Sequence, residues 1–210
     1  MHRLYFLRHG ETNINVEGGR FQGQIDTPEA GLTENGMEQA RQARREFARL
    51  GFSYELVYSS PLNRAVRTAV LVSGRPQSEI ILDSRLLEMN FGPLEGMTWD
   101  HMDPSKYRAM MEDFGHYYPG PGMESGVQLL ARVSSFLEDM KQQSAESALV
   151  STHGGTIRAM LTHLHQIDYR RFWKNPVGNC AWFELTLEDG QWVLTGQDTK
   201  KERDPEALEG

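Results

Sequence analysis

Short apolar runs alternate with longer amphipathic stretches along this 210-residue chain. The runs at residues 4–7, 54–59, 79–82 and 148–152 are rich in Leu, Val, Ile and aromatic residues and have the length of β-strands. Runs with few polar positions are typical of strands whose two faces are both buried. The intervals between them are long enough for the connecting helices that parallel strands require.

Four helices are predicted in the intervals, each from apolar residues three or four positions apart. One starts at the N-cap Thr33 and ends before Gly51, and a second follows Pro61, which suits a first helical turn. A third starts at Ser125, which can form a capping box with Gln128, and the fourth covers residues 157–164. Their predicted core positions are Met37, Ala40, Ala43, Phe47 and Leu50; Ala65, Val66, Ala69, Val70 and Val72; Val127, Leu130, Val133, Leu137 and Met140; and Ile157, Met160, Leu161 and Leu164.

The other segments complete the predicted fold. Residues 180–187 and 191–195 predict an antiparallel hairpin, and residues 10–32 predict a long loop. Residues 97–124 predict a partly helical lid insertion, and the charged tail at 199–210 is expected to be flexible. We therefore expect an α/β fold: a three-layer αβα sandwich with a mostly parallel sheet and the antiparallel C-terminal hairpin, forming a single catalytic domain over residues 1–198.

Composition and charge limit the classes of function that fit this chain. The net charge is −7 and no long basic run occurs, which argues against nucleic acid or an anionic membrane as the partner. No apolar run is long enough to span a membrane, and Arg8 and His9 interrupt the apolar N-terminus in a way that a secretion signal does not. The single cysteine, Cys180, cannot form an internal disulfide and lies in an apolar stretch typical of a buried thiol. These features predict a soluble, cytoplasmic protein.

Polar residues follow the predicted strands where each strand ends. Arg8, His9 and Gly10 follow the first, and His153 and Gly154 follow the last parallel one. Taken alone, the first group could be a solvated strand end with a turn glycine.

The other strand ends favour a shared site. Arg64 lies in the first turn of the helix after the second strand, and Glu88 follows the third. Because the carboxyl ends of parallel strands meet at one edge, where ligands of such sheets bind, these side chains are expected to converge with the two histidines.

Each of these residue types has a task in phosphoryl transfer. Arginine presents an always-charged planar fork to phosphoryl oxygens, and helix N-termini add backbone donors. A histidine ring nitrogen is a competent nucleophile when it is unprotonated, a state that nearby arginines favour by lowering the histidine pKa. A carboxyl group can protonate the departing oxygen and later deprotonate water. A metal site built on His9 and His153 is disfavoured, because too few further ligands accompany them.

Five motifs in order resemble the histidine phosphatase superfamily, the phosphoglycerate-mutase-like enzymes. They lie at residues 7–15, 20–23, 60–65, 87–96 and 151–154 and span nearly the whole chain. The resemblance implies that His9 becomes a phosphohistidine, that Arg8, Arg64 and His153 bind the phosphoryl group, and that Glu88 donates and accepts the proton. It also implies substrate contacts from Asn15, Gln22, Gly23 and the backbone of Gly154, and no metal or organic cofactor.

Within this family the chain is similar to the phosphatase branch that includes the α-ribazole-phosphate phosphatases. It lacks the longer insertion of cofactor-dependent mutases, so we expect a metal-independent phosphomonoesterase acting on a small phosphorylated metabolite. A mutase is the alternative, and a non-catalytic phosphate-binding module is disfavoured because none of the five core residues is replaced. One departure from the family pattern is the insertion of residues 29–31 before Leu32. The sequence does not predict the physiological ester, the oligomeric state or the role of the His116–Tyr118 segment, which could equally line the substrate side or pack on the surface.

Overall fold

A six-stranded sheet forms the centre of the computed structural model, which describes residues 1–112, 114–115, 120–165 and 169–200. Its strand order is β3-β2-β4-β1-β5-β6. The strands β1 (Arg3–Arg8), β2 (Leu56–Ser59), β3 (Ile81–Leu82) and β4 (Ser147–Thr152) are parallel to one another. The antiparallel hairpin of β5 (Trp182–Glu188) and β6 (Gln191–Asp198) extends the sheet beyond β1.

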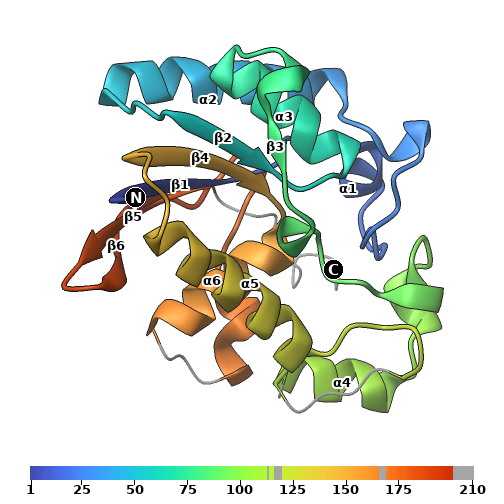
Figure 1. Cartoon of the computed structure of the whole chain (residues 1–210). Helices are drawn as coiled ribbons and strands as arrows, with labels where there is room; N and C mark the ends of the chain where they lie inside the picture. Colours follow the sequence, from blue (N-terminus) through green and yellow to red (C-terminus); the bar gives the residue numbers. More distant parts are fainter. Residues whose placement is uncertain (113, 116–119, 166–168, 201–210) are drawn as a thin grey trace.

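Helices cover both faces of the sheet, as Figure 1 shows. On one face lie α2 (Glu34–Leu50) and α3 (Asn63–Ser73), and on the other lie α5 (Gly126–Lys141) and α6 (Gly154–His165). The predicted α/β fold, with three αβα layers, a mostly parallel sheet and an antiparallel C-terminal hairpin, is therefore confirmed.

The buried side chains of β1 point alternately to the two faces. Leu4 and Phe6 belong to the core under α5 and α6, whereas Tyr5 and Leu7 belong to the core under α2 and α3. This alternation follows from the two-residue period of a strand, and burial on both faces explains why the strand is apolar throughout.

The predicted core positions of α5 were partly wrong. Val127 is 55% exposed and Leu130 is only half-buried, whereas Leu129 and Phe136 are fully buried. Gly126 explains why the buried face of α5 is rotated about the helix axis from the predicted face. A Cβ at this position would lie 2.3 Å from the carbonyl oxygen of Phe114, so Gly126 faces inward and the next residue faces outward. Leu50, in the last turn of α2, is likewise exposed, at 39%.

Two further predictions needed correction. The predicted strand at 79–82 is shorter, because Gln77–Glu79 forms a 3₁₀ helix and β3 is confined to Ile81–Leu82. The predicted loop at 10–32 contains the short helix α1 (Asn13–Glu17), which Thr12 and Asn15 start with a capping box, and a 3₁₀ turn at Pro28–Ala30.

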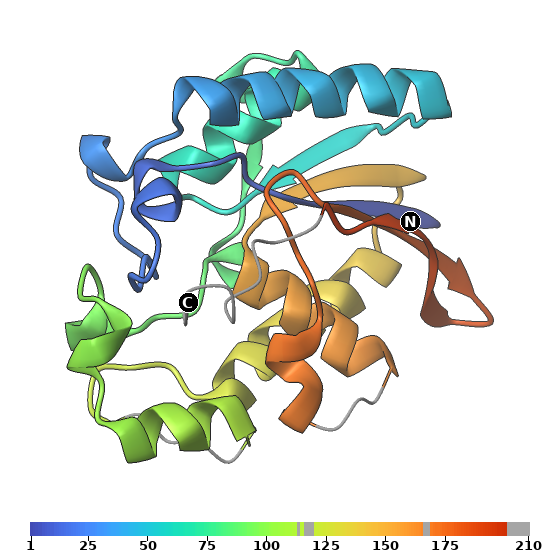
Figure 2. The ribbon, with the colours of Figure 1, turned by 180° about the vertical axis from the view of Figure 1, so that it is seen from behind.

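The predicted lid at 97–124 contains a 3₁₀ turn at Trp99–His101 and the helix α4 (Pro104–Glu112), and another 3₁₀ turn precedes it at Gly92–Leu94. Residues 116–118, for which no role was predicted, lie outside the described part of the chain. Further 3₁₀ turns occur at Ser84–Leu86 and Tyr169–Lys174. Figure 2 shows that residues 10–32 and the α4 region both lie beyond the carboxyl ends of the parallel strands.

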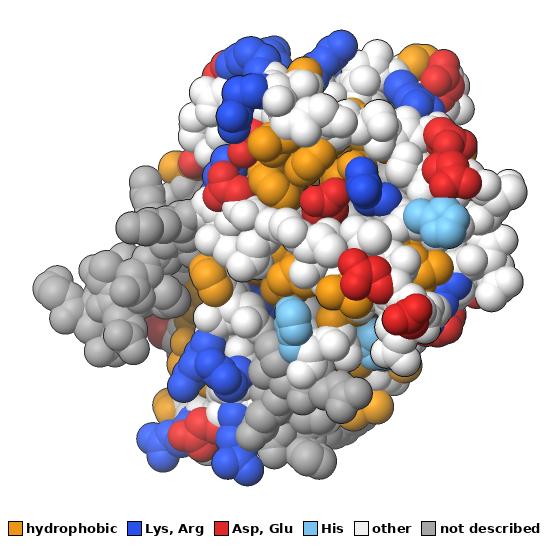
Figure 3. Space-filling view, turned by 90° about the vertical axis from the view of Figure 1, so that its left-hand side faces the viewer, with side chains coloured by type: hydrophobic (Ala, Val, Ile, Leu, Met, Phe, Trp, Pro, Cys, Tyr) orange, Lys and Arg blue, Asp and Glu red, His pale blue; other side chains and the backbone are white. Residues whose placement is uncertain are grey.

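The surface carries mixed charge. On the face in Figure 3, acidic and basic side chains are interspersed with small hydrophobic patches. Among the described residues, no helix is both long and apolar enough to cross a membrane.

Candidate active site

The register of the sheet brings the two predicted histidines together. Arg8 of β1 is paired with Thr152 of β4, so His9 and His153 leave neighbouring strands at the same level. Their rings lie 5.2 Å apart between centroids, inclined by 60°, and both side chains are buried.

A hydrogen bond defines the protonation of the His9 ring. Its Nδ1 lies 2.7 Å from the carbonyl oxygen of Gly10. A carbonyl only accepts hydrogen bonds, so Nδ1 carries the proton and Nε2 keeps its lone pair. Nε2 is thus the ring nitrogen with an unprotonated lone pair.

The surroundings keep both histidines neutral. Burial, followed by the charges of Arg64 and Arg8, holds the pKa of His9 well below 6.5. The pKa of His153 is lowered in the same way, by burial first and then by Arg64. The sequence predicted the effect of the arginines, but burial is the larger cause.

Arg64 is almost completely buried, and two backbone carbonyls orient it. Its guanidinium donates to the carbonyl oxygens of Ile25 at 2.8 Å and of Gly23 at 2.5 Å. Burial lowers its pKa to about 10, which still leaves it charged at neutral pH. Gly23 has φ of +49°, and a Cβ there would lie 2.2 Å from Oε1 of Glu95, so the turn requires glycine. The carbonyl of Gly23 therefore orients Arg64, and the predicted contact of Gly23 with substrate stays a prediction.

Arg8, the residue before His9, lies beside the start of α6. Its Nη1 donates to the carbonyl oxygen of Val177. A Cβ on Gly154, the first residue of α6, would lie 3.6 Å from Nε of Arg8. The N-terminus of α6 and Arg8 thus lie together, which is an arrangement suited to an anion.

Glu88 is oriented by backbone amides at both carboxyl oxygens. Oε1 accepts from the amide of Met89 at 2.8 Å, and Oε2 accepts from the amide of Gly155 at 3.2 Å. A Cβ on Gly155 would lie 2.4 Å from Oε1 of Glu88, so only glycine leaves room for the carboxyl group here. The first turn of α6 therefore contacts both Arg8 and Glu88.

Ser60 belongs to the site and was missed by the sequence reasoning. Its fully buried Oγ lies 2.8 Å from Nε2 of His153 and accepts from the amide of Leu62 at 3.3 Å. Among the described residues the hydroxyl has no other acceptor than Nε2, so we assign the hydroxyl as the donor and place the ring proton of His153 on Nδ1. Nδ1 of His153 and Nε of Arg64 are buried without a hydrogen-bond partner among the described residues. Buried donors of this kind can bind an oxygen acceptor, for example an oxygen of a phosphoryl group.

Gln22 and Asn15, which were predicted to contact the substrate, form hydrogen bonds within the protein. Gln22 accepts from Thr12 Oγ1 at 3.0 Å and donates to the carbonyl of Ala30 at 3.1 Å. Asn15 completes the capping box of α1, and its Oδ1 also accepts from Asn179 at 3.1 Å. Asn179 donates to the His9 carbonyl as well, at 3.2 Å. These contacts give both residues a clear structural role in the loop beside the nucleophile.

The described residues contain no group of three or more His, Cys, Asp or Glu side chains that could hold a metal ion.

Comparison with known proteins decides the family. The family model "Histidine phosphatase superfamily (branch 1)" matches residues 4–199. The chain belongs to the histidine phosphatase superfamily. It is 35% identical over 198 residues to "Putative phosphoserine phosphatase 2" of Hydrogenobacter thermophilus, covering 92% of this chain and 94% of the relative.

Two further similar proteins are named for a mutase and for a phosphatase. "Probable phosphoglycerate mutase GpmB" of Escherichia coli is 30% identical, over 93% of this chain and 90% of the relative. The crystal structure of a mutant phosphoserine phosphatase from Entamoeba histolytica in complex with phosphoserine superposes with a TM-score of 0.81 at 25% identity, covering 95% of this chain and 98% of the other. The predicted resemblance is confirmed, as is the prediction of a phosphoric monoester hydrolase acting on small metabolites.

Proposed function

We propose that this protein hydrolyses a small phosphate monoester without a metal ion, through a phosphohistidine at His9, and that phosphoserine is its first candidate substrate. The observation that carries the proposal is the state of the His9 ring. Nδ1 is bonded to the Gly10 carbonyl, the ring is neutral, and two arginines and a second histidine surround it.

In the first step, Nε2 of His9 attacks phosphorus as the ester P–O bond breaks. The guanidinium groups of Arg8 and Arg64, the Nδ1–H of His153 and the backbone amide of Gly154 stabilise the charge on the equatorial oxygens. Glu88 gives its proton to the leaving alkoxide, so the alcohol departs neutral. The phosphoryl group stays on His9.

In the second step, water attacks phosphorus and the N–P bond breaks. Glu88, now a carboxylate, takes a proton from the water, and inorganic phosphate leaves. Nε2 of His9 regains its lone pair and Glu88 regains its proton. The net reaction is hydrolysis, and the arginines supply the positive charge that a metal ion supplies in other phosphatases.

The comparisons support phosphoserine as the first ester to test, because relatives of two organisms carry that name. The test is a panel of phosphate esters, comprising phosphoserine, 3-phosphoglycerate, sugar phosphates and α-ribazole phosphate, assayed with and without a chelator. We expect release of inorganic phosphate that is unchanged by the chelator. Loss of activity on chelation would contradict the metal-free mechanism.

A matched pair of variants tests the nucleophile in the same assay. His9→Ala should lower kcat by at least about 1,000-fold, because no other group can replace the attacking nitrogen. His163→Ala, which removes an exposed histidine of α6, should leave kcat unchanged. Full activity in His9→Ala would contradict the proposal.

The mutase alternative is favoured by the relative named as a phosphoglycerate mutase. It requires that a glycerate hydroxyl, rather than water, accept the phosphoryl group from His9. Phosphate transfer between positions of phosphoglycerate that is faster than phosphate release would establish it. A cytoplasmic location stays a prediction from the sequence, which cell fractionation would test.

A further inference from the structure

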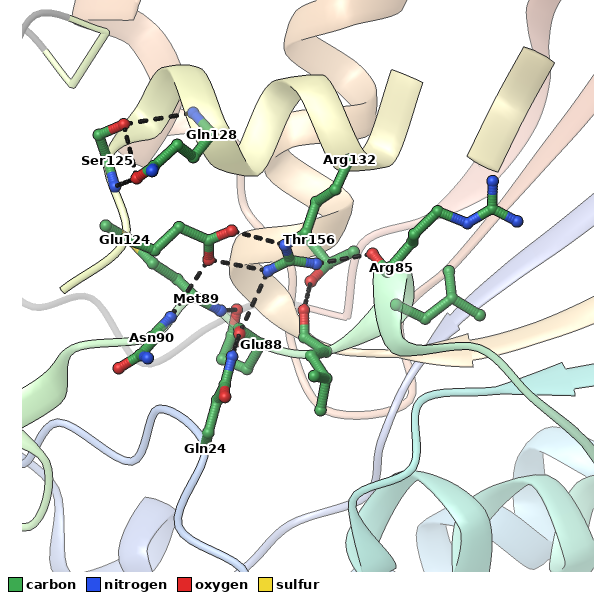
Figure 4. A network of polar contacts seen from close by, with 12 residues as sticks. Gln24, Arg85, Glu88, Met89, Asn90, Glu124, Ser125, Gln128, Arg132 and Thr156 are labelled. Atoms are coloured by element: carbon green, nitrogen blue, oxygen red, sulfur yellow. Dashed lines mark hydrogen bonds and ion pairs between the residues drawn. The ribbon is translucent and has the colours of Figure 1, made fainter. Parts of the chain in front are cut away.

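The backbone turn at residues 85–88, which carries Glu88, accepts hydrogen bonds from several side chains. One arginine donates to the carbonyls at both ends of this turn. Arg132 of α5 donates from Nη1 to the carbonyl of Arg85 at 2.6 Å. It donates from Nη2 to the carbonyl of Glu88 at 3.2 Å, where Gln24 also donates, at 2.9 Å. Figure 4 shows Arg132 and Gln24 meeting at Glu88 from different elements.

The two carbonyls between these ends accept hydrogen bonds from two threonines. Thr152, at the end of β4, donates to the carbonyl of Leu86 at 2.6 Å. Thr156 of α6 donates to that of Leu87 at 2.7 Å. Four consecutive carbonyls thus accept hydrogen bonds from side chains of α5, β4, α6 and the loop at Gln24. The path of this turn depends on those donors.

Arg132 is itself held by a partly buried ion pair. Glu124 accepts from its Nε at 2.6 Å and from its Nη2 at 3.0 Å, and the two side chains are only 12% and 18% exposed. Glu124 also joins Asn90: its Oε2 accepts from the Asn90 amide at 3.2 Å, and its own amide donates to the Asn90 carbonyl at 2.8 Å. The pair therefore ties both sides of Glu88 to the segment that starts α5.

We propose that Arg132 is a positioning residue for Glu88: by joining the carbonyls of Arg85 and Glu88 to Glu124, it sets where the Glu88 carboxyl meets the leaving oxygen. This inference rests on the proposed function, in which Glu88 is the proton donor. The guanidinium is needed because its rigid fork serves two carbonyls and a carboxylate at once, which the single ammonium of lysine cannot. The carboxyl group itself is aimed by the amides of Met89 and Gly155, so a shift of the turn changes its direction.

The test compares two esters that differ in their need for a proton. An alkyl ester such as phosphoserine must have its leaving oxygen protonated, whereas nitrophenolate departs from p-nitrophenyl phosphate without help. Both esters form the same phosphohistidine, and its hydrolysis also uses Glu88, so the comparison is made on kcat/KM, which reports the steps up to release of the alcohol. Arg132→Met and Arg132→Lys should lower kcat/KM for phosphoserine about 10- to 100-fold and leave kcat/KM for p-nitrophenyl phosphate within about threefold. The affinity of the free enzyme for both esters should stay nearly constant, since the phosphoryl contacts are untouched.

Two more variants control for folding. Asp139→Asn removes an exposed partner of the Arg85 side chain on the same helix and should leave both activities unchanged. Gln24→Ala removes the other donor to the Glu88 carbonyl without burying an unpaired charge, and should reproduce the selective loss in milder form if the Arg132 variants do not fold. Equal losses on both esters, or no loss on either, would overturn the proposal.

Glu88→Gln separates this inference from the proposed function. If Glu88→Gln lowers kcat/KM for phosphoserine and keeps kcat/KM for p-nitrophenyl phosphate while the Arg132 and Gln24 variants do not, the assignment of Glu88 as proton donor is retained and the positioning role of Arg132 is refuted. If Glu88→Gln keeps full activity on phosphoserine, both the proton-donor role of Glu88 and the positioning role of Arg132 are refuted.

Discussion

At the scale of single residues, the chemistry depends on which ring nitrogen carries the proton. His9 is set by a backbone carbonyl and His153 by the hydroxyl of Ser60, so one ring presents a lone pair and the other presents an N–H. Ser60 could not be identified from the sequence, because its partner lies 93 positions away and a serine in a Ser-Ser-Pro turn has an ordinary local explanation.

Substituting Ser60 by alanine should misplace the His153 proton. Without the hydroxyl donor, the ring can carry its proton on Nε2, and we expect kcat to fall about 10- to 100-fold with little loss of stability. Ser59→Ala is the control, because that equally buried hydroxyl donates only to the Ser60 carbonyl. Nitrogen chemical shifts of His153 report the tautomer directly, and an unchanged tautomer in Ser60→Ala would refute this role.

At the scale of elements, strand positions and the convergence of strand ends were predictable, whereas side-chain networks were not. A buried strand leaves a continuous apolar run, and parallel strands must end at one edge. The role of Arg132 has no local sequence signal, since its partners at Arg85 and Glu88 lie more than 40 positions away. The phase of α5 was ambiguous because eight apolar residues offered two overlapping stripes, and the packing of Gly126 decided between them.

The start of α2 packs backbone to backbone against the turn after β1. A Cβ on Gly36 would lie 2.1 Å from the carbonyl oxygen of Glu11, and one on Gly10 would lie 2.3 Å from that of Gly36. Gly36→Ala should therefore lower the free energy of unfolding by about 1–3 kcal/mol and reduce kcat, because the turn next to His9 must move.

The other end of the same helix offers the control. Gly51 has φ of +72° with nothing within 4 Å of an added Cβ, so Gly51→Ala should cost about 1 kcal/mol of stability through backbone strain alone. Its kcat should match the parent protein. Denaturant unfolding and steady-state kinetics on both variants test the pair, and unchanged kcat in Gly36→Ala would contradict the coupling.

At the scale of the whole molecule, burying two neutral histidines makes stability depend on pH. Below pH 6.5 the unfolded chain protonates both, whereas the folded protein does not until pH reaches their lowered pKa values. The unfolded state then binds more protons, so the free energy of unfolding falls as pH falls, by at most about 2.7 kcal/mol per pH unit for two groups.

Urea unfolding between pH 7 and 5 measures this slope. One core joins strand residues such as Phe6 with Met110 and Phe114 of the predicted lid, so we expect a single unfolding transition. His9→Gln should remove the part of the slope that His9 contributes, while His163→Ala should not alter it. A stability that is flat over this pH range would show that the histidines are not buried in the neutral form.

The most direct test of the central claim is to trap the phosphoryl group on His9. Rapid mixing with phosphoserine, quenching under alkaline denaturing conditions and peptide mass spectrometry should find one acid-labile phosphoryl group on the peptide that contains His9. The label should appear within a single turnover and disappear as inorganic phosphate is released. Turnover without any label on His9, or an undiminished label in His9→Ala, would contradict the account.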